Sequence, residues 1–333
     1  MTGKTPQADL ASRGVLLSRA LASIGETVTV IGMTLATGGN SRETWTADAR
    51  IGDDMRRVVL RCDPDAWIRP MEMEREIAGL RLAVRAGVPA PRILASSGKD
   101  GSNHATVDRP YVVTEFLDGT ALARRIIRDE GLARARGKFA KQCGEILARL
   151  HGAAAMADGW RPYDPIEELR EYLRRAAYPS PVLQGATRWL ADNRLPPAPL
   201  VPVHRDFRLG NLMIATDGIV GVLDWETCQL SEPEEDLAWL CARSWRYGGA
   251  NPVGGIGTLQ ELLGAYELGS GRKVDMARLH WWSVFAETRW GVAATVEQRP
   301  DSTPGDAMEQ AATIRRGCRQ EQNVLLELER FVK

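Results

Sequence analysis

Residues 203–226 carry the sequence VHRDFRLGNLMIATDGIVGVLDWE, in which two apolar runs flank Asp217-Gly218. This dipeptide favours a two-residue type I′ turn between the strands of a β-hairpin. With Asp217 and Gly218 as the central turn residues, symmetrical pairing sets Asn211 opposite Asp224, with Cα atoms about 5 Å apart. The pattern therefore predicts that an amide oxygen and a carboxylate converge at the open end of one hairpin.

Hard oxygen groups of this kind suit Mg²⁺, which binds a few protein ligands and keeps water and substrate phosphates as the others. Asp206 lies five residues before Asn211, on the segment that enters the hairpin. A carboxylate there can accept a hydroxyl proton and orient an attacking oxygen. Any one of these side chains could instead cap a turn or a helix. The three together predict a phosphoryl-transfer site, with Asp206 as base and Asn211 and Asp224 as metal ligands.

Upstream of this stretch the periodicity predicts a small antiparallel sheet with helices. The predicted elements are a helix over 8–24, strands over 27–36, 43–51 and 57–62, a helix over 71–86 and a strand over 110–117. Gly87 with Pro89 just beyond marks the end of the second helix. Asp118-Gly119 is a plausible crossing point, so we expect residues 1–117 to form one lobe.

Beyond residue 118 the pattern is mostly helical. The predicted helices cover 131–156, 165–177, 183–192, 233–247, 257–268, 275–297 and 305–330. We expect residues 118–333 to form a second lobe with the catalytic loop and the acceptor site. The predicted class is α+β, with two lobes and an active site in the cleft between them.

The motif His204-Arg205-Asp206 with Asn211, followed by Asp224 after a hairpin, resembles the catalytic loop and metal-binding aspartate of protein kinases. More closely, the chain resembles the aminoglycoside phosphotransferase and choline kinase superfamily over nearly its whole length from about residue 27. The segments DWE at 224–226 and EPEEDLAWL at 232–240 are similar to the kinase domain fused to some acyl-CoA dehydrogenases. This resemblance implies a protein-kinase-like bilobal fold in which residues 1–117 form the nucleotide-binding lobe. It also implies ATP and Mg²⁺ as cofactors and a small-molecule hydroxyl as acceptor.

The resemblance also implies roles for cationic side chains. Arg208 stands two residues after the base, where a cation touches the transferred phosphate and stabilises transition-state charge. Arg61 ends the third strand, where the family usually has a lysine over the α and β phosphates. Arginine can bind phosphate in a bidentate manner, but its planar geometry differs from that of lysine. The expected partner of Arg61 is Glu76 on the next helix.

Further nucleotide contacts are implied at two places. Gly39, Asn40 and Ser41 occupy the phosphate-covering loop, without the G-x-G-x-x-G pattern of protein kinases. Backbone groups from Glu115 to Leu117 would meet the adenine. Asp236 resembles a buried aspartate that braces the catalytic loop, and we interpret His151 and His204 as hydrogen-bonded structural residues.

Composition narrows the class of partner. Lys plus Arg and Asp plus Glu number 43 each, so no net field attracts nucleic acid or an acidic membrane surface. The five cysteines form no C-x-x-C pair, which favours reduced thiols in a cytoplasmic setting. No apolar run of 18 residues indicates a membrane span. We expect a cytoplasmic monomer or homodimer that binds a small molecule.

Two features that the sequence lacks limit the class of acceptor. Only eight residues separate Asp224 from Pro233, and neither D-F-G nor A-P-E occurs, so the peptide-docking segment of a protein kinase is absent. Residues 236–300 hold six acidic and seven basic side chains, without the acidic bias that a polycationic aminoglycoside would meet. The basic residues that would suit an anionic acceptor, such as a hydroxyacyl-CoA thioester, are Arg243, Arg246, Arg272, Lys273 and Arg289.

Two alternatives stay open at this point. One is a catalytically inactive nucleotide-binding scaffold, for which the arginine at position 61 is the only support. The other is an ATP hydrolase without an acceptor, which would release free phosphate instead of a phosphorylated alcohol.

Overall fold

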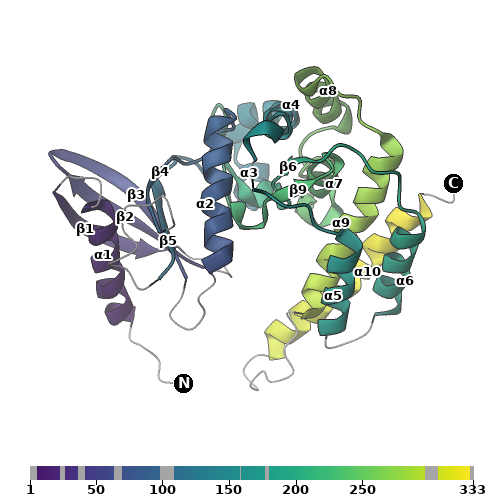
Figure 1. Ribbon diagram of the computed structural model, residues 1–333, viewed down its shortest axis with the longest axis horizontal. Coiled ribbons are helices and arrows are strands. Elements are labelled where there is room, and N and C mark those ends of the chain that lie inside the picture. Colours follow the sequence, from purple (N-terminus) through teal and green to yellow (C-terminus); the bar gives the residue numbers. More distant parts are fainter. Residues whose placement is uncertain are drawn as a thin grey trace. The chain divides into compact units, whose positions relative to one another are not determined.

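The computed structural model describes residues 6–22, 27–36, 42–63, 70–97, 109–157, 159–176, 180–296 and 307–330. The chain forms two compact units (Figure 1). The first comprises Met1–Gly119 and Val220–Cys228, and the second comprises Thr120–Ile219 and Gln229–Lys333. The short segment that contains Asp224 therefore belongs to the first unit, although it follows the catalytic loop in sequence.

A five-stranded antiparallel sheet forms the first unit, with strand order β1-β2-β3-β5-β4. The strands are β1 Val28–Leu35, β2 Glu43–Ile51, β3 Asp54–Cys62, β4 Ile93–Ser96 and β5 Tyr111–Glu115. On β2 every second residue from Trp45 to Ile51 is buried, the period-two pattern of a strand with one face in a core. The sheet therefore has a buried face that a helix must cover.

The helix α1 (Pro6–Ala22) packs on this sheet (Figure 1). Leu17, Ala20 and Leu21 on α1 are fully buried in one core with residues of β2, β3 and β5. The second helix of the unit, α2 (Pro70–Arg85), ends before Gly87, which has a φ of +71°. Glycine adopts this left-handed conformation without steric cost, so the predicted helix stop is confirmed.

A close approach joins α2 to the 3₁₀ turn η4 (Trp225–Thr227) within the first unit. A Cβ added to Gly79 would lie 2.8 Å from both Cys228 Sγ and Trp225 Cβ. The absence of a side chain at Gly79 thus allows the buried Trp225 to seat against α2. This contact fixes the turn that follows Asp224.

Helices dominate the second unit, and α9 lies beside α5, α6, α7 and α10 (Figure 1). Its longer helices are α3 Ala123–Arg128, α4 Ala133–Gly152, α5 Pro165–Arg175, α6 Pro181–Asp192, α7 Glu234–Cys241, α8 Leu259–Ser270, α9 Met276–Val296 and α10 Ala307–Glu329. The 3₁₀ turns are η1 Glu130–Leu132, η2 Ala154–Met156, η3 Leu209–Asn211 and η5 Arg243–Arg246. Its short strands are β6 Val201–Val203, β7 Leu212–Ala215 and β9 Gln229–Ser231. β6 pairs with β9, and β7 pairs with β8 (Gly218–Val222).

The predicted hairpin exists, but its predicted turn type and register were wrong. The turn residues are Thr216 and Asp217, and Gly218 already begins β8 with a φ of +143°. A type I′ turn needs a positive φ at both central residues, which Asp217 lacks. Gln142 on α4 accepts the backbone N–H of Ile219 at 3.1 Å, and its side chain lies where a Cβ of Gly218 would be. A tertiary contact therefore sets the position of the turn.

The predicted pairing of Asn211 with Asp224 does not follow from this hairpin. Asn211 ends η3, and Asp224 lies beyond the end of β8 with a φ of +69°. Other departures are smaller: β4 and α3 were not predicted, and the helix expected over 233–247 ends at Cys241 and gives way to η5. The α+β class is confirmed.

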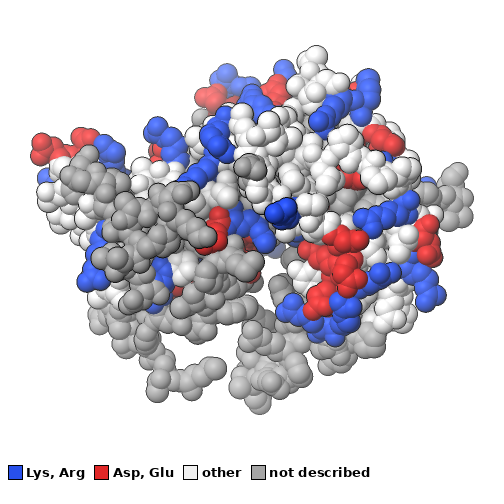
Figure 2. All heavy atoms as spheres, in the orientation of Figure 1, with Lys and Arg blue, Asp and Glu red and all other residues white. Residues whose placement is uncertain are grey.

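Charged side chains of both signs alternate across the described surface on the face drawn in Figure 2. This distribution matches the equal numbers of basic and acidic residues in the chain. Among the helices of the described ranges, none combines the length and apolar character needed to span a bilayer.

Candidate active site

A buried carboxylate binds the backbone of the loop that carries Asp206. Asp236 on α7 accepts the backbone N–H groups of His204 and Arg205, both at 2.8 Å. His151 Nε2 lies 3.3 Å from the same carboxylate, and its Nδ1 lies 3.0 Å from the hydroxyl of Tyr266. Despite burial, the hydrogen bonds and positive charge of these neighbours lower the pKa of Asp236. Asp236 and His151 therefore have the structural environments that the sequence predicted.

Arg205, which directly precedes Asp206, has a strained backbone conformation. Its φ is +67°, an uncommon value for a residue with a side chain. Its buried guanidinium donates to Glu235 at 2.9 Å and to Glu168 at 2.6 Å, and lies 3.7 Å from the ring centroid of Tyr163. Strained residues persist where surrounding contacts over-determine them, and they concentrate at functional sites.

Asp206 itself accepts hydrogen bonds at both carboxylate oxygens. Arg208 Nε donates to Oδ1 at 3.0 Å, and Trp239 Nε1 donates to the same oxygen at 2.8 Å. Asn211 Nδ2 donates to Oδ2 at 2.5 Å. The carboxylate still keeps 19% of its side-chain surface exposed, so an incoming hydroxyl can reach it. The structure thus brings the two predicted catalytic residues, Asp206 and Arg208, together with the predicted metal ligand Asn211.

Trp239 was not among the residues that sequence reasoning assigned to the site. It lies three residues after Asp236, so one helical turn of α7 carries both the loop-bracing aspartate and the indole that touches Asp206. That spacing is the signal that could have identified it. Trp239 also receives the guanidinium of Arg289 at 4.6 Å from its ring centroid.

Arg208 is held between aromatic side chains. Its guanidinium lies 4.7 Å from the ring centroid of Trp245, and its Nη1 donates to the hydroxyl of Tyr247 at 3.4 Å. Tyr247 has a φ of +50°. In the described part of the chain, the non-glycine residues with positive φ are Arg205, Asp224 and Tyr247. All three lie at or beside predicted site residues, which supports a functional assignment for this region.

A second group of predicted residues meets in the first unit. Arg61 on β3 forms an ion pair with Glu76 on α2, and its Nη2 donates to Asp224 Oδ1 at 3.0 Å. The side chain of Glu76 is 2% exposed, so this pair is buried rather than a surface contact. The expected Arg61–Glu76 ion pair is therefore present, and Asp224 joins it.

Arg42 completes this cluster and was missed by sequence reasoning. Its fully buried guanidinium donates to Asp63 at 2.9 Å, to Glu76 at 2.5 Å and to Glu226 at 3.1 Å. Glu76 is consequently shared between two arginines. Arg42 directly follows residues 37–41, but its partners lie 21 or more residues away in the sequence. No local sequence pattern therefore predicts these ion pairs.

The cluster crowds carboxylates around two guanidiniums. Within the described part of the first unit, the guanidiniums of Arg42 and Arg61 face five carboxylates, from Asp63, Glu72, Glu76, Asp224 and Glu226. Burial and the neighbouring charge of Asp224 raise the pKa of Glu226 to about 7. Such crowding favours binding of a further cation. The residues present therefore fit Mg²⁺, with Asp224 as a candidate ligand.

Asn211 offers the second candidate oxygen ligand. Its amide nitrogen donates to Asp206, so its amide oxygen is the atom suited to a metal.

Gly39, Asn40 and Ser41, predicted to cover the phosphates, lie outside the described residues. Glu115 ends β5, where its N–H donates to the carbonyl of Arg92 at 3.0 Å. Leu117 follows two residues later, before the boundary of the first unit.

The five basic residues expected to suit an anionic acceptor do not form one group. Arg289 Nη1 donates to the carbonyl oxygen of Arg205 at 2.7 Å, next to the catalytic loop. Lys273 is 91% exposed and pairs with Glu267. Arg243 and Arg246 line a separate cavity. Only Arg289 among these five has a described contact with the loop of Asp206.

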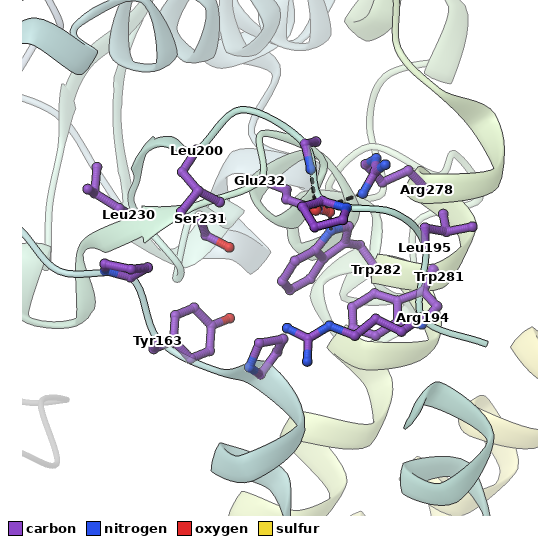
Figure 3. Close-up of a pocket in the computed structure, with 14 residues that line it drawn as sticks. Tyr163, Arg194, Leu195, Leu200, Leu230, Ser231, Glu232, Arg278, Trp281 and Trp282 are labelled. Atoms are coloured by element: carbon purple, nitrogen blue, oxygen red, sulfur yellow. Dashed lines mark hydrogen bonds and ion pairs between the residues drawn. The ribbon is translucent and has the colours of Figure 1, made fainter. Parts of the chain in front are cut away.

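Tyr163, whose ring contacts the guanidinium of Arg205, also lines a cavity of about 330 Å³ (Figure 3). Trp281 and Trp282 of α9 form its aromatic wall, and Glu232 lies between them and the 196–200 segment. The Glu232 carboxylate accepts from Arg278 at 2.7 Å and from Trp282 Nε1 at 2.9 Å. The polar groups at its centre thus satisfy one another. Tyr163 in its wall donates to Glu235, which also binds Arg205.

Comparison with known proteins places this geometry in a family. A model described as the phosphotransferase enzyme family matches residues 34–282, about three quarters of the chain. The chain belongs to the phosphotransferase enzyme family. The match contains Asp206, Asn211 and Asp224, so the candidate residues of both units lie inside the segment that defines the family.

The chain is also similar to two curated proteins and to solved structures. The chain is 24% identical over 203 residues to acyl-CoA dehydrogenase family member 10 of Mus musculus, which covers 56% of this chain and 18% of the relative. The chain spans less than a third of the length of the curated relatives it matches.

The choline kinase of Streptococcus pneumoniae has a similar structure, with a TM-score of 0.59, 16% identity and coverage of 93% of this chain and 99% of that chain. An amicoumacin kinase in complex with AMP-PNP, Ca²⁺ and Ami gives a TM-score of 0.61 at 14% identity, with 95% of each chain covered. These similarities confirm the protein-kinase-like fold. The expected enzyme class, a small-molecule phosphotransferase, is confirmed by membership of the phosphotransferase enzyme family.

Proposed function

We propose that this phosphotransferase uses ATP and Mg²⁺ to phosphorylate a hydroxyl group of a small molecule. The proposal rests mainly on the hydrogen bonding and partial exposure of the Asp206 carboxylate. Its two oxygens are fixed by Arg208, Trp239 and Asn211, while part of the carboxylate stays accessible. A base held in one orientation but open to solvent is what positioning a hydroxyl requires.

In the proposed reaction Asp206 orients the acceptor hydroxyl and takes up its proton. The hydroxyl oxygen forms a bond to the γ-phosphorus while the bond from that phosphorus to the β,γ-bridging oxygen breaks, and ADP leaves. Arg208, which lies 3.0 Å from Asp206, would stabilise the charge on the transferred group. Arg61, held by Glu76, would bind the phosphates of the nucleotide.

Asn211 and Asp224 are the residues proposed to hold magnesium. The metal, when bound, supplies neutralisation of phosphate charge. Asp224 accepts from Arg61 in this structure, so metal binding would compete for one of its oxygens. The close grouping of carboxylates around Arg42 and Arg61 supports binding of a cation in this unit.

For the acceptor we propose a hydroxylated metabolite, possessing an anionic group such as that of a hydroxyacyl-CoA, rather than an antibiotic. Two observations support this class. Arg289 lies over Trp239, pairs with Glu168 at 3.7 Å and donates to the carbonyl of Arg205, so its cation lies beside the loop of Asp206. The curated relatives are named as acyl-CoA dehydrogenases.

The test is a transfer screen with Mg-ATP against hydroxyacyl-CoA thioesters, choline, hydroxylated amino acids, macrolides and aminoglycosides. Wild-type protein is expected to transfer phosphate to one class, and Asp206→Ala is expected to lose at least 100-fold in kcat, since a positioned base contributes about 10²–10⁴-fold. Asp217→Ala is the matched control, because Asp217 is 72% exposed in the following turn.

Unchanged transfer by Asp206→Ala would show that this carboxylate is not the base. Release of free phosphate at the same rate with and without acceptor would identify a hydrolase. No phosphate transfer to any acceptor of the panel, together with retained ATP binding, would favour the inactive nucleotide-binding alternative.

A further inference from the structure

A cavity of about 710 Å³ in the second unit lies apart from the residues assigned to phosphoryl transfer. Arg243 and Arg246 of η5 line one side, and Glu327, Glu329 and Arg330 near the end of α10 line another. Its apolar wall is made by Pro252, Leu259, Met276, Leu279 and Leu326. The cavity volume lies within the usual range of small-molecule sites, which is about 300–1,000 Å³.

Arg246 is the unusual group in this cavity. Its half-buried guanidinium donates only to the backbone carbonyl of Cys241, through Nε at 3.3 Å and Nη2 at 3.0 Å. Across the ranges that the structure describes, no carboxylate lies within 4.0 Å of it. By contrast, Arg243 and Arg330 both bind Glu327, at 3.0 and 2.9 Å. One cation of the cavity therefore has no counter-ion of its own.

The nearby carboxylate Glu287 does not compensate this charge fully. It accepts the backbone N–H of Arg243 at 2.5 Å and side-chain donors of Ser244 and Asn323. Burial raises the pKa of Glu287 to about 7, so near neutral pH a large fraction of it is protonated. Burial and the positive charge of Arg243 lower the pKa of Arg246, although Glu327 and Glu287 act in the opposite direction.

We propose that this cavity binds a small amphipathic anion, with a carboxylate or phosphate head paired to Arg246 and an apolar body against the Leu259, Met276 and Leu279 wall. An anion at Arg246 would supply the missing counter-ion, because a partly buried charge is costly unless it is paired. The apolar wall is open to such a body, since Met276 at its rim is 54% exposed.

The turn η5 connects this cavity to the catalytic loop. Arg243 and Arg246 line the cavity, whereas Trp245 in the same turn lies 4.7 Å from the guanidinium of Arg208. Tyr247, the residue that follows η5, accepts a hydrogen bond from Arg208 Nη1 at 3.4 Å. A bound anion would therefore shift η5 and, with it, the position of Arg208. This consequence rests on the proposed function, but the binding site itself does not.

The test is isothermal titration calorimetry of the full chain with butanoate, hexanoate and hexyl phosphate, with hexan-1-ol as the uncharged probe. At least one hexyl anion is expected to bind, and hexanoate about tenfold or more tighter than hexan-1-ol. Each added CH₂ should tighten binding about fourfold, the equivalent of about 0.8 kcal/mol per buried methylene. Arg246→Met should lose at least tenfold, whereas Arg246→Lys should stay within a few-fold of wild type.

Arg188→Met is the control, because Arg188 is an exposed arginine on α6 outside the cavity. Binding that is equal in wild type and Arg246→Met, or independent of chain length, would overturn the proposal. If Arg246→Met does not fold, the comparison of hexanoate with hexan-1-ol on wild type still decides. These measurements need no catalysis, so their failure is distinct from a failure of the proposed function. Once an acceptor is known, saturating hexanoate should change kcat more than the KM for ATP; an unchanged kcat would disprove the coupling to Arg208.

Discussion

The indole of Trp239 meets the proposed base and a cation at the same time. Its Nε1–H donates to Asp206 Oδ1 at 2.8 Å, while Arg289 lies 4.6 Å from its ring centroid. Trp239→Phe removes the donor and keeps an aromatic ring. Hydrogen bonds to charged groups contribute about 1.5–3 kcal/mol. We therefore expect kcat to fall roughly 10- to 100-fold with little change in the KM for ATP, as steady-state kinetics would show.

A second tryptophan provides the matched control for this residue. Trp281 is equally buried, and its Nε1–H donates to the carbonyl of Leu190 at 3.1 Å, a contact without a catalytic residue. Trp281→Phe should lower the melting temperature to a similar extent but leave kcat close to wild type. An equal loss of kcat in both variants would mean that Trp239 acts only through stability.

At the scale of elements, the contact between α2 and η4 tests how tightly Asp224 is held. Gly79→Ala would place a Cβ 2.8 Å from Cys228 Sγ and Trp225 Cβ. Overpacking of this kind costs about 1–3 kcal/mol, although alanine is the better helix former. We expect a lower free energy of unfolding and weaker binding of Mg-ATP, measured by chemical denaturation and by titration.

Gly264 on α8 is the matched glycine, because a Cβ there would meet nothing within 4 Å. Gly264→Ala should raise the free energy of unfolding by roughly 0.5–1 kcal/mol through helix propensity alone. If Gly79→Ala were also stabilising, the close packing of α2 on Trp225 would be wrong.

The junction of α9 with η5 should make stability depend on pH. Burial raises the pKa of Glu287 from 4.5 to about 7 in the folded chain. A raised folded-state pKa contributes stability that is complete below about pH 4.5 and is lost as the pH rises through about 7. Glu287→Gln cannot ionise and should escape this loss.

The measurement for Glu287 is urea denaturation of both proteins between pH 5 and 8. The free energy of unfolding of Glu287→Gln, relative to wild type, should increase with pH by about 2–3 kcal/mol over this range. A difference that is independent of pH would show that Glu287 stays ionised throughout.

At the scale of the whole molecule, the nucleotide and metal should stabilise the folded chain by mass action. Mg-ATP at 100 times its Kd adds about 2.7 kcal/mol to the free energy of unfolding. For a chain of this size we expect the melting temperature to rise by several degrees. EDTA and Asp224→Asn should both remove the metal-dependent part of the shift, whereas Asp217→Asn should keep it. A shift that survives both EDTA and Asp224→Asn would rule out a metal role for Asp224.

The fold was largely predictable because its signals are local. Apolar spacing along residues 8–24 and 71–86 predicted α1 and α2, and the stop at Gly87 needs only its own backbone freedom. The strand β4 was missed because its four residues, Ile93–Ser96, carry too short a pattern. It is a strand through its pairing with β5, which lies about 20 residues further along the chain.

The sequence by itself determined the α+β class, the family, and Asp206, Asn211 and Asp224 as candidates, because a short motif with fixed spacing records them. Only the tertiary structure decided which side chains hold these residues. Trp239 reaches Asp206 across 33 residues, and Arg42 reaches Glu76 across 34. Gln142 on α4 binds the first residues of β8, so the hairpin turn lies at a different position from the predicted one. Such contacts depend on how distant elements pack together, and packing leaves no periodic trace in the sequence.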